Sequence, residues 1–225
     1  MKVIYRMCDI ASTNPSPVFQ EDKHRLNKLC LKSFLKAFEG VDIDITFLCD
    51  YCKPETIDMI QNLSPGSEVI QTAIGINETM LRSYMIAQDQ NDDILFQECD
   101  YLYLPNTGKS MVEAVKYLGL VSPYDHLNFY IDRNLHSKTA EIELIGNHHF
   151  RSTERNTMTF GVRNDVFKKH YETFYRYGYL DGDVWYDLKR DGQQLYVPIP
   201  SLATHMVKDY MAPTIEWQMH WKTQT

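Results

Sequence analysis

Short apolar runs alternate with amphipathic stretches along the first half of the chain. Apolar and β-branched runs typical of strands cover residues 3–7, 43–49, 68–71 and 93–97. Between them lie stretches with apolar residues at helical spacing, the longest over residues 21–39. Strands that alternate with helices in this way predict an α/β fold, with a mostly parallel sheet and helices on both of its faces.

Local signals mark where the predicted helices begin and end. Gly40 follows the longest apolar stripe, as a glycine does at a helix C-terminus. Pro54 stands at the first position of the second predicted helix, where its missing N–H costs nothing. Asn77 is a suitable N-cap for the third, which reaches about residue 90. The first half therefore has the predicted order βαβαβαβ.

The second half of the chain is less regular. Helices are predicted over 109–118, 164–177 and 183–190, and strands over 139–145, 157–162 and 195–199. No internal repeat, low-complexity segment or linker interrupts it. We therefore expect one domain over residues 1–225.

Composition and charge narrow the class of protein. The 225 residues are 44% hydrophobic and 24% charged, as in ordinary globular proteins. The net charge of -7 argues against a nucleic-acid-binding protein, which usually has a basic face. No stretch approaches the roughly 18 apolar residues of a transmembrane helix, and residues 1–6 turn polar too soon for a signal peptide. We expect a cytoplasmic protein without a transmembrane segment.

Two acidic residues follow the fourth predicted strand. Glu98 and Asp100 are two positions apart, so strand alternation points both to the same face. Carboxylate oxygens suit hard cations such as Mg²⁺ and Mn²⁺, which in turn hold a diphosphate. Ligands of open α/β sheets also bind at this end of the strands. A solvated acidic loop after a core strand explains the same two residues, and their spacing does not separate the two interpretations.

Other polar residues occur in a set order around the acid pair. They are Asp50 after the second strand, Asn77 and Arg82 on the third helix, Asp181 and Asp183 at a late helix, and His205. This ordered set resembles the GT-A glycosyltransferases, nucleotide-sugar enzymes with a single Rossmann-like sheet. The resemblance is clearest over residues 77–87 and 93–100, and the order of elements follows it over about residues 1–205. It implies one GT-A-like domain, with a nucleotide-sugar-binding half (1–105) and a less regular acceptor half (106–225).

The resemblance implies a donor-binding role for five positions. Arg6 and Asp9, at the end of the first strand, would border the nucleotide. Asp50 would hydrogen-bond the base or the ribose. Arg82 would reach the diphosphate or steady the acid loop, and Asn77 precedes it on the same helix.

The resemblance also implies metal ligands and a catalytic base. Asp100 would bind Mn²⁺ or Mg²⁺, with His205 as a further ligand. Glu98, where the family more often has Asp, would bind the metal or touch the ribose. The cation would stabilise the negative charge on the departing diphosphate. Asp183, or Asp181, would accept the proton of the acceptor hydroxyl.

Each of these residues also has a structural explanation. Asp50 can cap the turn after its strand, and Arg82 can pair with Glu78 on the same helix. Asp183 can act as an N-cap, and His205 can be a structural hydrogen-bonding residue. It is the joint order of these positions along the chain that favours an enzyme.

The sequence therefore favours a metal-dependent glycosyltransferase that moves a sugar from a UDP- or GDP-sugar to a hydroxyl-bearing acceptor, first of all a glycan. A nucleotidyltransferase is the second hypothesis. Such enzymes usually carry a Gly-rich, basic loop after the first strand. Residues 9–17 of this chain contain Pro15 and Pro17 but no Gly or Lys, which counts against this hypothesis. A catalytically inactive nucleotide-binding module of the same fold is the third. Glycosylation of a modified nucleobase in DNA is a minority option because of the negative net charge.

Overall fold

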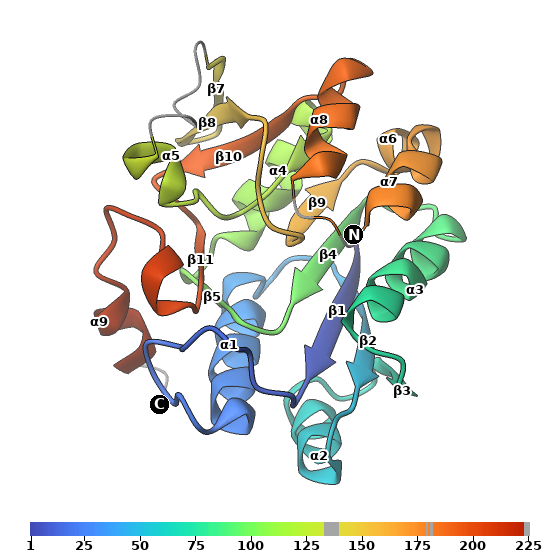
Figure 1. The fold of residues 1–225 in the computed structure, drawn as a ribbon, viewed down its shortest axis with the longest axis vertical. Coiled ribbons are helices and arrows are strands. Elements are labelled where there is room, and N and C mark those ends of the chain that lie inside the picture. Colours follow the sequence, from blue (N-terminus) through green and yellow to red (C-terminus); the bar gives the residue numbers. More distant parts are fainter. Residues whose placement is uncertain (133–139, 179, 181, 223–225) are drawn as a thin grey trace.

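The strands predicted for the first half form the parallel part of the central sheet, and the predicted helices connect them (Figure 1). The computed structural model describes residues 1–132, 140–178, 180 and 182–222. The first-half elements are β1 (Lys2–Cys8), α1 (Lys23–Ala37), β2 (Asp44–Asp50), α2 (Pro54–Leu63), β3 (Glu68–Thr72), α3 (Ile76–Gln88) and β4 (Ile94–Glu98). Their order confirms the predicted βαβαβαβ arrangement.

The second half adds shorter elements. Its strands are β5 (Tyr101–Tyr103), β6 (Leu120–Val121), β7 (Ile142–Ile145), β8 (His148–Thr153), β9 (Phe160–Val162), β10 (Leu195–Ile199) and β11 (Ala203–His205). Its helices are α4 (Gly108–Leu118), α5 (Asn128–Ile131), α6 (Asn164–Lys169), α7 (Tyr171–Tyr177), α8 (Asp183–Arg190) and α9 (Trp217–Lys222), with a 3₁₀ turn over Lys208–Tyr210. None of the helices that the structure describes is long and apolar enough to cross a bilayer.

Within the described ranges the main sheet has nine strands, in the order β3-β2-β1-β4-β9-β6-β10-β8-β7. The first four are parallel. β9 runs antiparallel to both β4 and β6, and β10 pairs parallel with β6. A separate antiparallel pair, β5 with β11, lies beside the main sheet. The predicted α/β class with a mostly parallel central sheet is confirmed.

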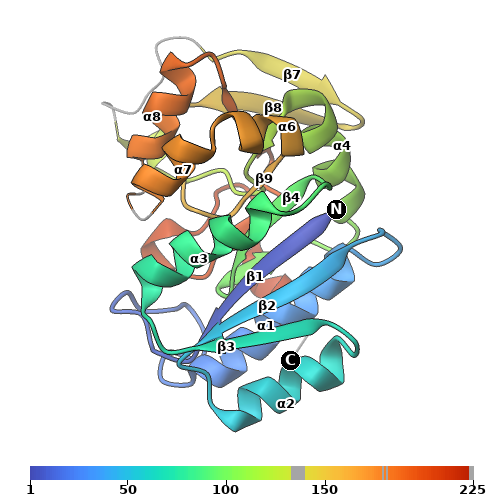
Figure 2. The ribbon, with the colours of Figure 1, turned by 90° about the vertical axis from the view of Figure 1, so that its right-hand side faces the viewer.

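Alternation along the strands divides the core into two layers. Val3, Tyr5 and Met7 of β1 pack with α1, α2 and α4 on one face of the sheet. Ile4 lies in the opposite layer, with α3, α6, α7 and α8. Figure 2 shows α3 in front of the sheet and α1 and α2 behind it. Helices therefore cover both faces, as the strand–helix alternation predicted.

The register of the parallel strands brings their carboxyl ends to one edge of the sheet. Cys8 of β1 lies opposite Asp50 of β2, which in turn lies opposite Thr72 of β3. Arg6 of β1 lies opposite Glu98 of β4. The acidic residues that follow these strands therefore meet at the same edge.

The strand predicted over 157–162 forms only over Phe160–Val162. Two further differences from the predicted elements have local reasons. The helix predicted over 164–177 is two helices, because the chain bends at His170 (φ -108°, ψ 18°). After the bend, Phe174 stacks on Phe160 in the same core layer, with ring centroids 5.5 Å apart. The N-cap of α3 is Gly75 and not Asn77, because Gly75 (φ 95°) turns the chain toward the Asp50 carboxylate, which accepts its N–H.

Truncation of Phe96 tests how much the packing of the core layer under α3 contributes to stability. Phe96 is 1% exposed and packs against Tyr84 and Phe160, so Phe96→Ala should lower the free energy of unfolding by about 3–5 kcal/mol. Urea unfolding followed by circular dichroism measures the change. The control is Tyr117→Ala on α4, where the side chain is 63% exposed and the loss should stay within about 0.5 kcal/mol. Equal losses in the two variants would contradict this packing.

Candidate functional site at the carboxyl edge of the sheet

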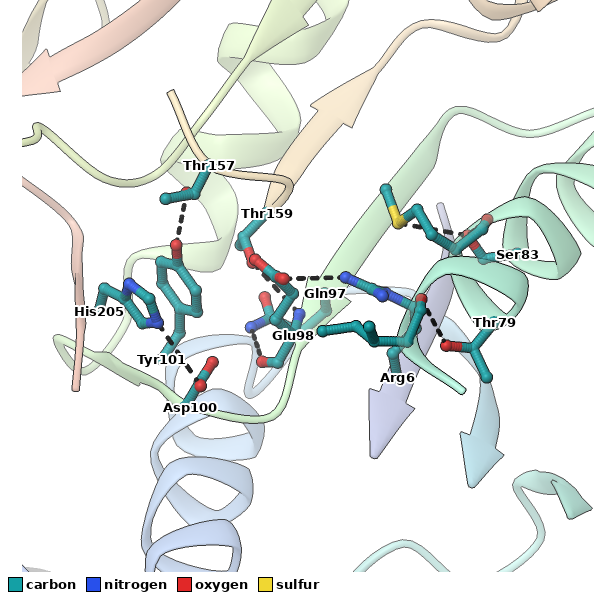
Figure 3. A network of polar contacts seen from close by, with 12 residues as sticks. Arg6, Thr79, Ser83, Gln97, Glu98, Asp100, Tyr101, Thr157, Thr159 and His205 are labelled. Atoms are coloured by element: carbon teal, nitrogen blue, oxygen red, sulfur yellow. Dashed lines mark hydrogen bonds and ion pairs between the residues drawn. The ribbon is translucent and has the colours of Figure 1, made fainter. Parts of the chain in front are cut away.

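Asp100 and His205, far apart in the sequence, lie side by side in the fold. β5 begins directly after Asp100 and pairs with β11, where His205 is opposite Tyr101. The Asp100 Oδ2 atom is 3.5 Å from His205 Nε2 and 3.7 Å from Lys23 Nζ, at the start of α1. Figure 3 shows the imidazole and the carboxylate pointing toward each other. A carboxylate between two cationic groups is thus the centre of this edge.

Tyr101 fixes the position of the imidazole. Its ring stacks on His205 with centroids 4.9 Å apart and an interplanar angle of 3°. Its hydroxyl donates to Thr157 Oγ1 over 2.5 Å, as Figure 3 shows. The stack and the hydrogen bond restrict rotation of His205, which keeps Nε2 directed at Asp100.

The charges of this group shift two pKa values in opposite directions. Burial opposes ionisation of Asp100, but the charges of His205 and Lys23 outweigh it and lower the pKa of the carboxyl. Burial also favours neutral His205, yet the nearby carboxylate of Asp100 prevails and raises the pKa of the imidazole. Asp100 is therefore ionised at neutral pH, and its negative charge favours the protonated imidazole.

Both carboxylate oxygens of Glu98 have partners within the chain. Arg6 Nη2 donates to Oε1 over 2.8 Å, and the Thr159 hydroxyl donates to Oε2 over 3.1 Å. The same hydroxyl accepts the Glu98 backbone N–H over 3.2 Å. Arg6, predicted to border the nucleotide, and Glu98, predicted to bind metal or ribose, thus bind each other.

Asp9 and Asp50 join neighbouring elements at this edge. The Asp50 carboxylate accepts the Thr72 hydroxyl over 2.9 Å and the backbone N–H groups of Ile74 and Gly75 over 2.8 and 3.0 Å. The side chain of Asp50 thus supports the turn from β3 into α3, and not the turn after its own strand that the sequence suggested. The Asp9 carboxylate accepts from Asn27 on α1 and from the backbone N–H of Lys53.

The remaining predicted residues lie away from the Asp100–His205 contact. Asn77 and Arg82 are exposed on α3, and no hydrogen bond or ion pair joins Arg82 to Glu98 or Asp100 among the residues described. Asp183 is the exposed first residue of α8. Asp181 falls outside the described residues. The donor-binding and catalytic roles of these residues stay predictions.

A cavity of about 160 Å³ lies next to Thr157 and the start of α8. It is lined by His126, Asn128, Phe129, Arg155, Asn156, Thr157 and Gly182. Burial lowers the pKa of His126 to about 4, so this imidazole is neutral at physiological pH. Thr157 borders the cavity and also binds Tyr101, which connects the cavity wall to His205.

The side chains at this edge fit a divalent cation poorly. Within the described part of the chain, no group of three or more His, Cys, Asp and Glu side chains could hold a metal ion. Asp100 and His205 are two candidate ligands, but Lys23 occupies the side of Asp100 Oδ2. Glu98 is bound by Arg6 and Thr159. The requirement for Mn²⁺ or Mg²⁺ stays a prediction.

Lys23, Thr157 and Thr159 complete this group, and sequence patterns alone did not identify them. Lys23 lies in the amphipathic stretch predicted over residues 21–39, where an isolated lysine carries no special signal. A usable signal existed, because a helix that follows a parallel strand begins at the carboxyl edge of the sheet, and Lys23 is the first residue of α1. Thr157 and Thr159 are two positions apart in front of β9, and only the pairing of β9 with β4 places them beside Tyr101 and Glu98.

Comparisons with solved structures support the fold. The galactosyltransferase LgtC, solved with donor and acceptor sugar analogues, is 12% identical over 88% of this chain and 73% of its own (TM-score 0.51). A putative nucleotide-diphospho-sugar transferase from Desulfovibrio desulfuricans is 11% identical over 87% and 78% (TM-score 0.52). The inositol-1-phosphate CTP transferase of T. maritima is 10% identical over 99% and 95% (TM-score 0.54). No protein-family model and no curated protein matches the chain.

These structures confirm the resemblance at the level of the fold. Sugar transferases and a nucleotidyltransferase both have a fold similar to that of this chain. The fold alone therefore does not decide between the two reactions.

The Asp100–His205 contact predicts a pH-dependent contribution to stability. A raised histidine pKa stabilises the fold fully below about pH 6.5, and the gain is lost as pH rises through the folded-state pKa. The lowered pKa of Asp100 adds stability above about pH 4 that is lost in acid. His205→Gln should therefore cost more stability near pH 6 than near pH 9, measured by urea unfolding at both values.

The control for this measurement is His149→Gln, which removes an exposed histidine on β8. We expect its effect on stability to be the same at the two pH values. A pH-independent loss in His205→Gln would contradict an ion pair with Asp100.

Proposed function

We propose that this protein is a glycosyltransferase that moves a sugar from a nucleoside-diphosphate donor to a hydroxyl group. The observation that carries the proposal is the contact between Asp100 and His205 at the carboxyl edge of the parallel strands. Ligands of open α/β sheets bind at this edge. Two segments that are distant in the sequence, β4–β5 and β11, form this contact. A solvated acidic loop would not require such a pairing.

The surroundings of this contact supply places for both substrates. The donor would lie along the ends of β1 and β2, with its diphosphate near Asp100 and Lys23. The acceptor would enter the cavity beyond Tyr101, whose lining includes the neutral polar residues Asn128, Asn156 and Thr157. Such groups suit the hydroxyls of a sugar, so a glycan is the acceptor that this cavity favours.

Asp183 is the proposed base for the acceptor hydroxyl. It follows Gly182, which lines the cavity, so its backbone is next to the acceptor site. Acceptance of a proton by a positioned carboxylate accelerates such a step by typically about 10²–10⁴-fold.

A nucleotidyltransferase is the second candidate, favoured by the likeness to a CTP transferase over nearly the whole chain. That reaction requires positive charge around a triphosphate. The loop between β1 and α1, residues 9–22, contains no Gly, Lys or Arg. Sugar transfer from a diphosphate donor requires less positive charge from this loop. We therefore prefer sugar transfer to nucleotidyl transfer.

A substrate screen separates the two reactions. Purified protein is incubated with UDP-, GDP-, CDP- and dTDP-sugars and a glycan mixture, with and without Mn²⁺, and release of nucleoside diphosphate is measured. A parallel set contains nucleoside triphosphates with sugar phosphates and is assayed for pyrophosphate. We expect diphosphate release in the first set. Pyrophosphate release alone would favour nucleotidyl transfer, and no turnover in either set would favour an inactive module.

Asp183→Asn should lower kcat for sugar transfer by about 10²–10⁴-fold, because the amide cannot accept the hydroxyl proton. The matched control is Asp187→Asn on the same helix, where the carboxylate pairs with Arg190 over 2.7 Å on the surface. This control should keep its activity. Unchanged kcat in Asp183→Asn would remove Asp183 from the catalytic role while leaving the proposed reaction open.

A further inference from the structure

Lys23 places a buried positive charge beside the acid of the site. Its side chain is 11% exposed, and Nζ lies 3.7 Å from Asp100 Oδ2. Lys23 and Asp100 also border one small cavity of about 20 Å³, between the loop after β1 and the segment after β11. Lys23 and Asp100 therefore border the same small space at this edge of the sheet.

Glu98 and Asp100, the two acids of the predicted pair, are each already matched by a cation of the chain. Arg6 binds Glu98 over 2.8 Å, and Lys23 with His205 flanks Asp100. A divalent cation on Asp100 Oδ2 would meet the Lys23 ammonium at short range, and their repulsion would be weakly screened because the side chains are largely buried. Metal binding would require Lys23 to leave its place.

We propose that Lys23 supplies the positive charge that stabilises the leaving nucleoside diphosphate, so that sugar transfer proceeds without a divalent cation. This inference rests on the proposed glycosyltransferase activity. It assigns Lys23 a direct contact with the donor, and it gives Asp100 the task of holding the ammonium group in position.

The proposed step is balanced without a further reactant. The bond between the anomeric carbon and the phosphate oxygen breaks, and its electron pair stays on the diphosphate. A bond forms between the same carbon and the acceptor oxygen, whose proton passes to the Asp183 carboxylate. Lys23 keeps its proton and donates a hydrogen bond to the phosphate oxygen as negative charge grows there.

The chemistry of lysine suits this task. Its ammonium group is a compact charge with three donors, so it can contact Asp100 and a phosphate oxygen together. Arg6 is less suited, because its guanidinium donates a hydrogen bond to Glu98 over 2.8 Å, whereas Lys23 Nζ lies 3.7 Å from Asp100 Oδ2. Of Lys23 and Arg6, Lys23 is thus the group better placed to contact the phosphate.

The test compares turnover of the active nucleotide sugar in excess EDTA with turnover in added Mn²⁺. The wild-type rate in EDTA should stay within about two-fold of the rate with Mn²⁺. Lys23→Met should lower kcat by about 10²–10³-fold, the usual loss when one donor to a developing anion is removed, and Mn²⁺ should not restore it. Lys23→Met should also weaken UDP or GDP binding in EDTA, measured by calorimetry. The matched control is Lys28→Met on the exposed side of α1, which should behave as wild type.

The outcomes separate this inference from the proposed function. Loss of wild-type turnover in EDTA with recovery in Mn²⁺ overturns the role of Lys23, whatever the variants do, and leaves sugar transfer intact. Full activity of Lys23→Met in EDTA overturns it as well. Absence of turnover with every nucleotide sugar, with and without Mn²⁺, overturns the proposed function and this inference together. Circular dichroism of each variant establishes that it is folded.

Discussion

The parallel pairing of β1 with both β2 and β4 is the constraint on which the rest of the structure depends. Parallel strands all end at the same edge of a sheet, so Cys8, Asp50 and Glu98 finish close together. The chain must then cross over, and α1 therefore begins at that edge with Lys23. One topological requirement thus brings the acids and a cation to the same place.

Charge compensation is the second requirement of this edge. Partly buried carboxylates are costly unless they are paired and hydrogen-bonded. The chain pairs Glu98 with Arg6 and Thr159, and Asp100 with Lys23 and His205. The charges of His205 and Lys23 lower the pKa of Asp100 and keep that carboxylate ionised. Under the proposed function they also place positive charge where the anionic donor would bind.

The small sheet of β5 and β11 joins the two halves of the chain. It brings His205 next to Asp100 and stacks the imidazole on Tyr101. The hydroxyl of Tyr101 reaches Thr157, which borders the cavity lined by second-half residues. The Asp100 group and the cavity therefore share one wall, beside which the proposed function places its two substrates.

Local patterns in the sequence determined the first half of the fold and the place of the acid pair. Amphipathic helices and apolar strands carry their own periodicity, and their alternation leaves few ways to cover the sheet, so β1 to β4 were predictable. Strands of two or three residues, such as β6 and β11, carry no such signal. The partners of Asp9, Asp50, Glu98 and Asp100 were decided only by tertiary structure. Whether a carboxylate faces a backbone N–H, an arginine or open solvent depends on which distant segment packs beside it, and neither side chain nor spacing encodes that by itself.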